Sequence, residues 1–358
     1  MYDGEAIVSD RKLIRETANK ILEAVTKGYG QTIAEAEWNS PDFIMLDKLT
    51  QNVFDFSAAK DYRQIRDMNA ALRDGDRIRS FREFREQVNA INGKYNGNWL
   101  RAEYNHAIAA SQSAARWTEF ESRKKTMPYL QYMAIMDVNT REDHAALNGV
   151  IKAIDDKFWS TWFPPNGWGC RCEAVQLPGS GYNETPDNKI VYPTKTQKNF
   201  KINFGKEKIV FPPEHPYYKN MPANVVNTLK QDVKNGVNNY YNNIVKQWAN
   251  ENVKGGKTFE ADNLYSGKIK IAVEDTVKAA NHLTGSTKSV ITHCIENINT
   301  WEQLEANVGL KHPRTDFSDF NNYKVTLGDK DYVIQVGIST KTKEERFYTV
   351  FPMANKKT

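Results

Sequence analysis

One stretch of the sequence contains four side chains that could bind a metal ion together. They lie within the segments DVNTREDHAALNG and PPNGWGCRC and are Asp137, His144, Cys170 and Cys172. A carboxylate, an imidazole and two thiols could converge on one tetrahedral zinc ion. The segment also fits a metal-free core motif, because His144 shares a helical face with Leu147 and because C-R-C lacks the two-residue spacing usual in zinc sites. Two interpretations therefore stay open here, a structural zinc and a packed histidine.

The last hundred residues hold a second set of candidates, which suit chemistry on a phosphodiester. Metal-independent RNA cleavage needs a base for the 2′-hydroxyl, an acid for the leaving oxygen and a cation for the phosphorane charge. Histidine titrates near neutral pH, and arginine can bind phosphate through two nitrogens. The candidate catalytic residues are His282, His293, His312, Arg314, Arg346 and Thr349. No glycine-rich phosphate loop accompanies them, so non-catalytic binding and a purely structural module remain alternatives.

Charge is unevenly distributed along the 358 residues, whose net charge is +5. Up to Tyr182 there are 24 Lys and Arg against 25 Asp and Glu, and from Asn183 onward there are 25 against 19. The second half contains 23 Lys but only two Arg. We therefore expect two modules that join near residue 182. The lysine-rich module suits contact with nucleic acid, because such binding depends on phosphate neutralisation.

Composition excludes several classes of protein. Hydrophobic residues make up 40% and aromatic residues 11%, which predicts a globular chain. The first residues carry charge and no apolar core, so we expect no secretion by a signal peptide. The longest uncharged run, Phe158 to Cys170, is far shorter than the roughly 20 apolar residues of a spanning helix, so no membrane association is expected. Three cysteines cannot form a disulfide framework.

The elements that would position the metal candidates are mainly helical. Apolar periodicity predicts helices at 10–28, 81–93, 99–123 and 141–154. Ser9 is the expected N-cap of the first helix and Gly28 its stop, and Thr140 is the expected cap of the last. Small residues along 99–123 predict close approach of a neighbouring element. A hydrophobic strand is predicted at 129–136, just before Asp137.

The second half is expected to combine helices with a short antiparallel sheet. Helices are predicted at 221–252, 290–298 and 300–309, and strands at 322–327, 331–339 and 345–351. Gly328-Asp329-Lys330 forms the expected turn between the first two strands. Residues 179–222 are rich in Pro, Gly, Lys and Asn, which is typical of a connecting arm that lies on another surface. The fold class expected for the chain is α+β.

These features divide the chain into three parts. Residues 1–180 form a mainly helical domain with a small β element, most firmly defined at 97–178. Residues 181–256 form a connecting arm and a helix. Residues 257–358 form a basic α+β module, which follows from the charge and strand pattern.

The motif around the metal candidates resembles the phage Mu protein F-like minor head proteins. A long small-residue helix, a strand, D-x-x-T-R-x-x-H and P-P-N-G-W-x-C-R-C occur here in that family's order. The matching residues are Asp137, Thr140, Arg141, His144, Gly149, Phe158, Pro164 to Trp168, Cys170, Arg171 and Cys172. The resemblance implies a non-catalytic domain of a tailed-phage or prophage minor head protein. Such a protein binds portal and capsid or scaffold proteins during head assembly in the host cytoplasm and then lies in the head interior of the virion.

The C-terminal module resembles small nucleases of the barnase, EndoU, colicin and RelE-like group in its element order and composition. This resemblance implies contact with genomic DNA or host RNA and makes the module a candidate metal-independent ribonuclease. The competing interpretation is a bacterial or prophage-encoded nuclease toxin or effector whose N-terminal domain serves delivery. A module that only binds nucleic acid remains open beside both.

Overall fold

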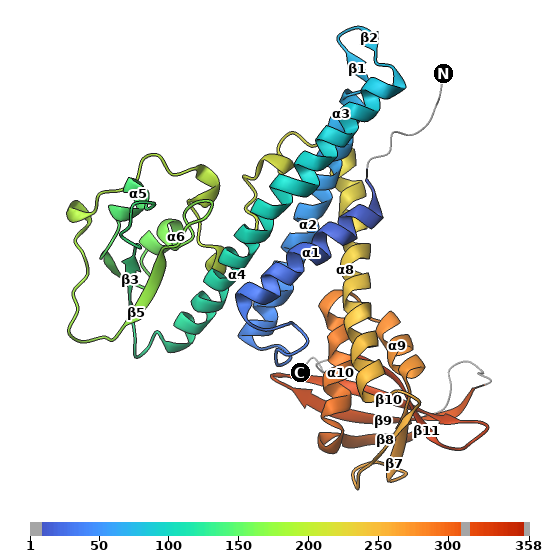
Figure 1. The fold of residues 1–358 in the computed structure, drawn as a ribbon. Helices are drawn as coiled ribbons and strands as arrows, with labels where there is room; N and C mark the ends of the chain where they lie inside the picture. Colours follow the sequence, from blue (N-terminus) through green and yellow to red (C-terminus); the bar gives the residue numbers. More distant parts are fainter. Residues whose placement is uncertain (1–8, 309–315, 354–358) are drawn as a thin grey trace. The chain divides into compact units, whose positions relative to one another are not determined.

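The structure is a computed structural model that describes residues 9–308 and 316–353 (Figure 1). The chain folds into two compact units. The first unit consists of Met1–Glu35 and Ile44–Gly236, and the second of Ala36–Phe43 and Val237–Thr358. A short segment near the N-terminus thus belongs to the same unit as the C-terminal part of the chain.

Long helices make up most of the first unit. They are α1 (Arg11–Tyr29), α2 (Pro41–Ala70, whose first three residues belong to the second unit), α3 (Phe81–Gly93), the π-helix η1 (Lys94–Trp99) and α4 (Leu100–Arg123). The strands β1 (Arg73–Asp74) and β2 (Arg77–Ile78) form a small hairpin between α2 and α3. The helices expected at 10–28, 81–93 and 99–123 are therefore confirmed to within two residues.

The ends of α1 differ from the expected ones. Asp10 caps the helix by accepting hydrogen bonds from two backbone N–H groups, whereas Ser9 donates a hydrogen bond of 2.6 Å to Asp232. The helix runs past Gly28 and ends at Gly30, whose φ of 92° lies in the left-handed region that favours glycine. Gly28 instead permits close packing of α1 on α4, since a Cβ there would collide with Ser111 Oγ and the Ile108 carbonyl. The close approach expected along α4 is confirmed.

A small antiparallel sheet follows α4 in the order β4-β3-β5. Its elements are β3 (Tyr129–Met133), α5 (Glu142–Ala145), β4 (Ile151–Ala153), α6 (Phe158–Trp162) and β5 (Glu173–Leu177). The expected helix at 141–154 is wrong beyond its first turn. Gly149 has a φ of +81°, which ends the turn, and the next residues pair with β3 through Lys152 opposite Leu130. Leu130, Tyr132 and Trp159 are fully buried between the sheet and α6.

The segment after β5 packs onto the helices of the first unit. It contains the short helices η2 (Asp187–Lys189), η3 (Lys198–Phe200), α7 (Phe204–Glu207) and η4 (Pro216–Tyr218). Phe200, Phe204 and Phe211 are buried, and the Phe211 ring stacks on Phe56 of α2. This proline-rich segment therefore adds aromatic side chains to the core of the unit, which its polar composition did not predict.

The second unit is built on one six-stranded sheet, of order β6-β7-β11-β10-β9-β8. The strands are β6 (Lys257–Glu260), β7 (Lys268–Ile271), β8 (Glu302–Val308), β9 (Phe317–Leu327), β10 (Lys330–Ser339) and β11 (Glu345–Pro352). The expected meander is confirmed as β9-β10-β11, and β11 pairs with β7 in parallel. The helix expected at 300–309 is wrong, because Glu302 to Val308 pair with β9 as an edge strand.

Helices complete this unit. The expected helix at 221–252 is confirmed as α8 (Ala223–Asn252), whose residues from Val237 onward belong to the second unit. The others are α9 (Val273–Asn281), η5 (Gly285–Ser289), α10 (Val290–Glu296) and η6 (Ile298–Thr300). Residues 36–43 also contribute, since Trp38 Nε1 donates a hydrogen bond of 3.0 Å to the Tyr332 hydroxyl. Helices and mainly antiparallel sheets confirm the α+β class. None of the described helices is long and apolar enough to cross a membrane.

Candidate functional site

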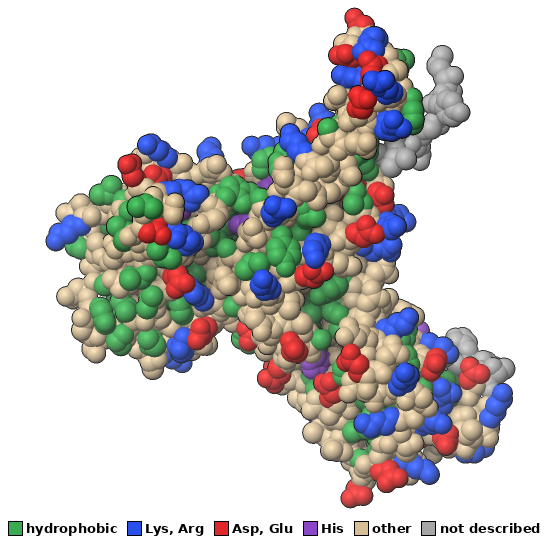
Figure 2. All heavy atoms as spheres, viewed as in Figure 1, with side chains coloured by type: hydrophobic (Ala, Val, Ile, Leu, Met, Phe, Trp, Pro, Cys, Tyr) green, Lys and Arg blue, Asp and Glu red, His purple; other side chains and the backbone are tan. Residues whose placement is uncertain are grey.

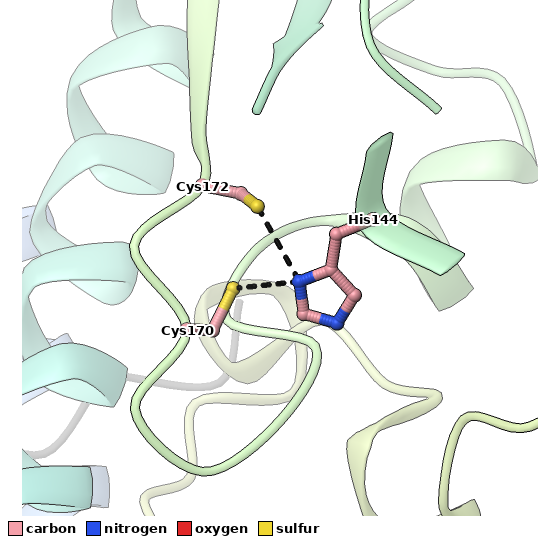
Figure 3. A group of neighbouring side chains, drawn as sticks. All are labelled: His144, Cys170 and Cys172. Atoms are coloured by element: carbon pink, nitrogen blue, oxygen red, sulfur yellow. Dashed lines mark hydrogen bonds between the residues drawn. The ribbon is translucent and has the colours of Figure 1, made fainter. Parts of the chain in front are cut away.

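Three of the four predicted metal ligands lie together in the first unit. His144 Nδ1 is 3.5 Å from Cys170 Sγ and 3.4 Å from Cys172 Sγ (Figure 3). In a tetrahedral zinc site, Zn–N of about 2.0–2.1 Å and Zn–S of about 2.3 Å place nitrogen and sulfur about 3.5 Å apart. The distances in this group match that edge. His144, Cys170 and Cys172 could therefore hold a metal ion.

Short local structures position these ligands. His144 lies in α5, the single turn that follows Arg141. Cys170 follows Gly169, whose φ of +65° lets the chain turn, and Cys172 directly precedes β5. One ligand therefore comes from a helical turn, and two come from the loop that leads into β5.

Hydrogen bonds influence the two thiols in opposite directions. The bond from Cys172 is the main reason why the pKa of Cys170 falls to about 4, and bonds from His144 and the Asn166 N–H act in the same direction. The hydrogen bond that Cys172 donates to Cys170, together with burial, raises the pKa of Cys172. Interactions of its sulfur with Tyr132 and with the Ile135 N–H lower this pKa in part. Each sulfur thus has donors that stabilise a thiolate.

Asp137 is not part of the group. Its two carboxylate oxygens accept hydrogen bonds of 2.7 Å each from the guanidinium of Arg171. These bonds hold the pKa of Asp137 well below its usual range. The carboxylate of the D-x-x-T-R-x-x-H motif therefore binds the arginine of C-R-C in the structure.

Two further motif residues fix the loop that carries the cysteines. Arg141 Nη2 donates a hydrogen bond of 2.7 Å to the Trp168 carbonyl, and a Cβ at Gly167 would lie 3.1 Å from Arg141 Nη1. Asn166 is buried and donates to the carbonyls of Thr161 and Phe200. The sequence identified the P-P-N-G-W motif as part of this loop. The hydrogen-bond partners of Arg141 and Asn166 could not be predicted from it.

Two of the predicted catalytic residues line one cavity of the second unit. Its volume is about 560 Å³, and its lining includes His282, Arg346, Lys278, Lys341, Tyr348 and Asp275. The guanidinium of Arg346 binds the buried carboxylate of Asp275, with Nη2 at 2.8 and 2.9 Å from the two oxygens. His282 caps the end of α9 and faces the Tyr348 ring at 6.2 Å. Sequence reasoning had not identified the lysines or Asp275 as part of this site.

The remaining candidates lie elsewhere. His293 is buried, with Nδ1 2.9 Å from the Ser289 carbonyl and Nε2 3.3 Å from the Ala36 carbonyl, and it is not among the described residues that line the cavity. Thr349 is half-buried on β11 and is likewise not part of that lining. His312 and Arg314 lie outside the described residues. Of the six predicted catalytic residues, the structure therefore brings together His282 and Arg346.

Known proteins are similar to the segment that carries the metal group. Residues 55–175 match the family described as Phage Mu protein F like protein. Protein F of Escherichia phage Mu, which bears the name of a capsid assembly protein, is 38% identical over 85 residues, or 24% of this chain and 19% of that protein. The Mu-like prophage FluMu F protein of Haemophilus influenzae is 44% identical over 64 residues, or 18% of this chain and 16% of that protein.

These matches are local. They span less than a fifth of the length of either curated relative. No solved structure matches the chain. The family match ends at residue 175, so it includes His144, Cys170 and Cys172 but not the cavity of the second unit. Residues 55–175 of this chain are therefore similar to the phage Mu protein F like family.

Proposed function

We propose that the protein takes part in assembly of a tailed-phage or prophage head, where it binds the portal and the capsid or scaffold proteins. The observation that carries this proposal is the match of residues 55–175 to the Mu F-like family, together with the capsid-assembly name of a relative. In this proposal the protein meets its partners in the host cytoplasm and stays in the head interior of the virion.

An exposed apolar surface in the matched segment supports binding to another protein. Figure 2 shows hydrophobic side chains gathered on this part of the molecule. Met136 and Val138, in the loop after β3, are 64% and 99% exposed. Met133, Ile135 and Val175 are also exposed. Exposed apolar side chains that occur close together in sequence suit a protein contact surface, and we assign this one to the portal.

The test uses particles produced with the wild-type gene or with a Met136→Asp, Val138→Asp double variant. We expect mass spectrometry to find the wild-type chain in purified heads and the variant to be depleted at least tenfold. A double variant at exposed positions of the second unit, Lys268→Asp with Lys330→Asp, is the control. Absence of the wild-type chain from heads would refute the proposal.

We further propose that His144, Cys170 and Cys172 bind a structural zinc ion. Imidazole and thiolate are the ligands that zinc prefers in structural sites, and the separations in the group fit its tetrahedral geometry. Metal analysis of the purified chain is expected to give close to one zinc per molecule. A value near zero after purification without chelators would refute it.

The second unit is a candidate for contact with nucleic acid, and for ribonuclease activity. The specific observation is the cavity that combines cationic side chains with His282 and Tyr348. Cations bind phosphates, and aromatic rings stack on unpaired bases. The full chain should cleave tRNA or total RNA, and His282→Ala should remove the activity while Lys330→Ala, an exposed change outside the cavity, should retain it.

The outcomes of the RNA experiment are separable. Binding without cleavage would support a module that only binds nucleic acid. Neither binding nor cleavage would refute both roles of the second unit and leave the proposal for head assembly intact. RNA cleavage by a chain that is absent from heads would favour the nuclease toxin or effector.

A further inference from the structure

We propose that the zinc ion held by His144, Cys170 and Cys172 keeps an exchangeable fourth position that a small anion can occupy. This inference rests on the zinc binding proposed above, and it concerns the coordination of the metal. Most structural zinc sites have four protein ligands, whereas a site with three protein ligands leaves the fourth position to a solvent molecule or another external ligand.

The group supplies three ligand atoms. Among the described residues, one group of at least three His, Cys, Asp or Glu side chains could hold a metal ion. It consists of His144, Cys170 and Cys172. Nδ1 of His144 is the atom that faces both sulfurs (Figure 3). One nitrogen and two sulfurs occupy three corners of a tetrahedron.

The polar neighbours of the group are engaged with other partners. Both oxygens of Asp137 accept hydrogen bonds from Arg171. The amide of Asn166 accepts a hydrogen bond of 3.2 Å from the Tyr132 hydroxyl and donates to two carbonyls. A change of partner by Asp137 would leave the guanidinium of Arg171 without its carboxylate. These contacts argue against a fourth ligand from the motif itself.

Space for an external ligand adjoins the group on two sides. Cys170 and Cys172 line a cavity of about 90 Å³, and His144 lines another of about 340 Å³. A water molecule takes up about 30 Å³ in the liquid. Either cavity can therefore accommodate a water molecule or a small anion without movement of the fold.

The charge of the metal centre permits an anion at that position. Zinc with two thiolates and a neutral imidazole has no net charge, so an added anion leaves one negative charge on the centre. Arg116 and Arg171 line the smaller cavity together with Glu173. Arg141 and Lys195 line the larger one together with Glu142 and Asp143. Glu173 pairs with Arg116 and Asp137 pairs with Arg171, so the binding energy of an anion would come mainly from the metal ion itself.

The test replaces zinc by Co²⁺ in the full-length chain, because Co²⁺ accepts the same ligands and its absorption reports their number and type. We expect a thiolate-to-cobalt charge-transfer band, and a saturable change of the ligand-field bands when azide is added. Asp137→Asn should give the wild-type spectrum before and after azide, since Asp137 is not a ligand. Cys294→Ala, which removes the cysteine outside the group, should do the same.

Two results would overturn the inference and differ in what else they affect. A charge-transfer band that azide leaves unchanged would mean that the fourth ligand is a protein atom, with zinc binding itself upheld. Absence of the charge-transfer band would refute zinc binding as well. A spectral change in Asp137→Asn before azide would identify Asp137 as the fourth ligand and would also refute the exchangeable position.

Discussion

The guanidinium of Arg171 binds both carboxylate oxygens of Asp137 at 2.7 Å. This pair joins the start of the D-x-x-T-R-x-x-H motif to the C-R-C motif and orients the loop beside the two cysteines. Asp137→Asn removes the charge but retains one acceptor oxygen. We expect zinc content to stay at the wild-type value and the melting temperature to fall only slightly, because the pair is exposed. Zinc content that falls by half or more would contradict this assignment.

Removal of the metal should destabilise the first unit. A ligand that binds only the folded state raises its stability, and structural zinc makes its ligands fold around it. We expect a strong chelator to lower the melting temperature of the wild-type chain and added zinc to restore it. Cys172→Ser should melt at the lower temperature with or without chelator. A wild-type chain that does not respond to chelator would contradict the prediction.

A buried ion pair offers a test of the helical core. Lys60 of α2 pairs with Glu103 of α4, and the Tyr217 hydroxyl donates a hydrogen bond of 2.9 Å to the same carboxylate. Lys60→Met leaves that charge without its cation and should cost about 3–5 kcal/mol in free energy of unfolding. The double variant Lys60→Met, Glu103→Gln should recover most of the loss. Denaturant titration measures both, and equal losses in the single and double variants would contradict the pair's role.

Asp61 makes a specific contribution to the pH dependence of stability. Burial is the main cause that raises its pKa to about 7, and the charges of Asp10 and Asp232 act in the same direction. Between about pH 4 and pH 7 the folded state then holds a proton that the unfolded state has lost, so this group lowers stability as pH rises.

The variant Asp61→Asn does not titrate and can still accept the hydrogen bond from the Asp10 N–H, which is 2.7 Å in length. Its free energy of unfolding should therefore increase relative to wild type from pH 4 to pH 7, by about 1.4 kcal/mol for each unit of pKa shift, and change no further above that range. Urea titrations at a series of pH values measure the difference. A difference that stays constant with pH would contradict the raised pKa.

Two glycines provide a matched pair for the packing of α1 on α4. Gly28→Ala places a methyl group against Ser111 and the Ile108 carbonyl, and the overpacking should cost about 1–3 kcal/mol. Gly93→Ala, at the end of α3, meets nothing within 4 Å and should stabilise the helix by roughly 0.5–1 kcal/mol. Thermal denaturation compares them. Equal effects of the two changes would mean that the close approach of α1 and α4 does not occur.

Local periodicity was sufficient to predict α1, α4, α8 and the meander β9-β10-β11. Each of these elements buries one face, so its apolar residues recur at the period of a helix or a strand. It failed where long-range pairing decides the structure. Residues 302–308 have a helical composition but bind to the edge of β9, and residues 151–153 pair with β3. Such pairing outweighs the small preferences of individual residues.

The metal group could be predicted in part for a related reason. His144, Cys170 and Cys172 stand out by residue type, and their distances in the structure agree with a shared ion. Asp137 was predicted as a metal ligand, but in the structure it pairs with Arg171. Sequence spacing does not reveal this pairing. The same holds for Arg346, whose partner Asp275 lies 71 residues away in the chain.

The segment Ala36–Phe43 makes the second unit discontinuous in sequence. Trp38 and Asn39 bind Tyr332 and Asp329, and the Ala36 carbonyl contacts His293. A gene fusion with one breakpoint between the two halves would deliver a second unit without these contacts. Exchange of this unit between related genes would therefore require two coordinated crossovers, or co-evolution of an octapeptide within the N-terminal region.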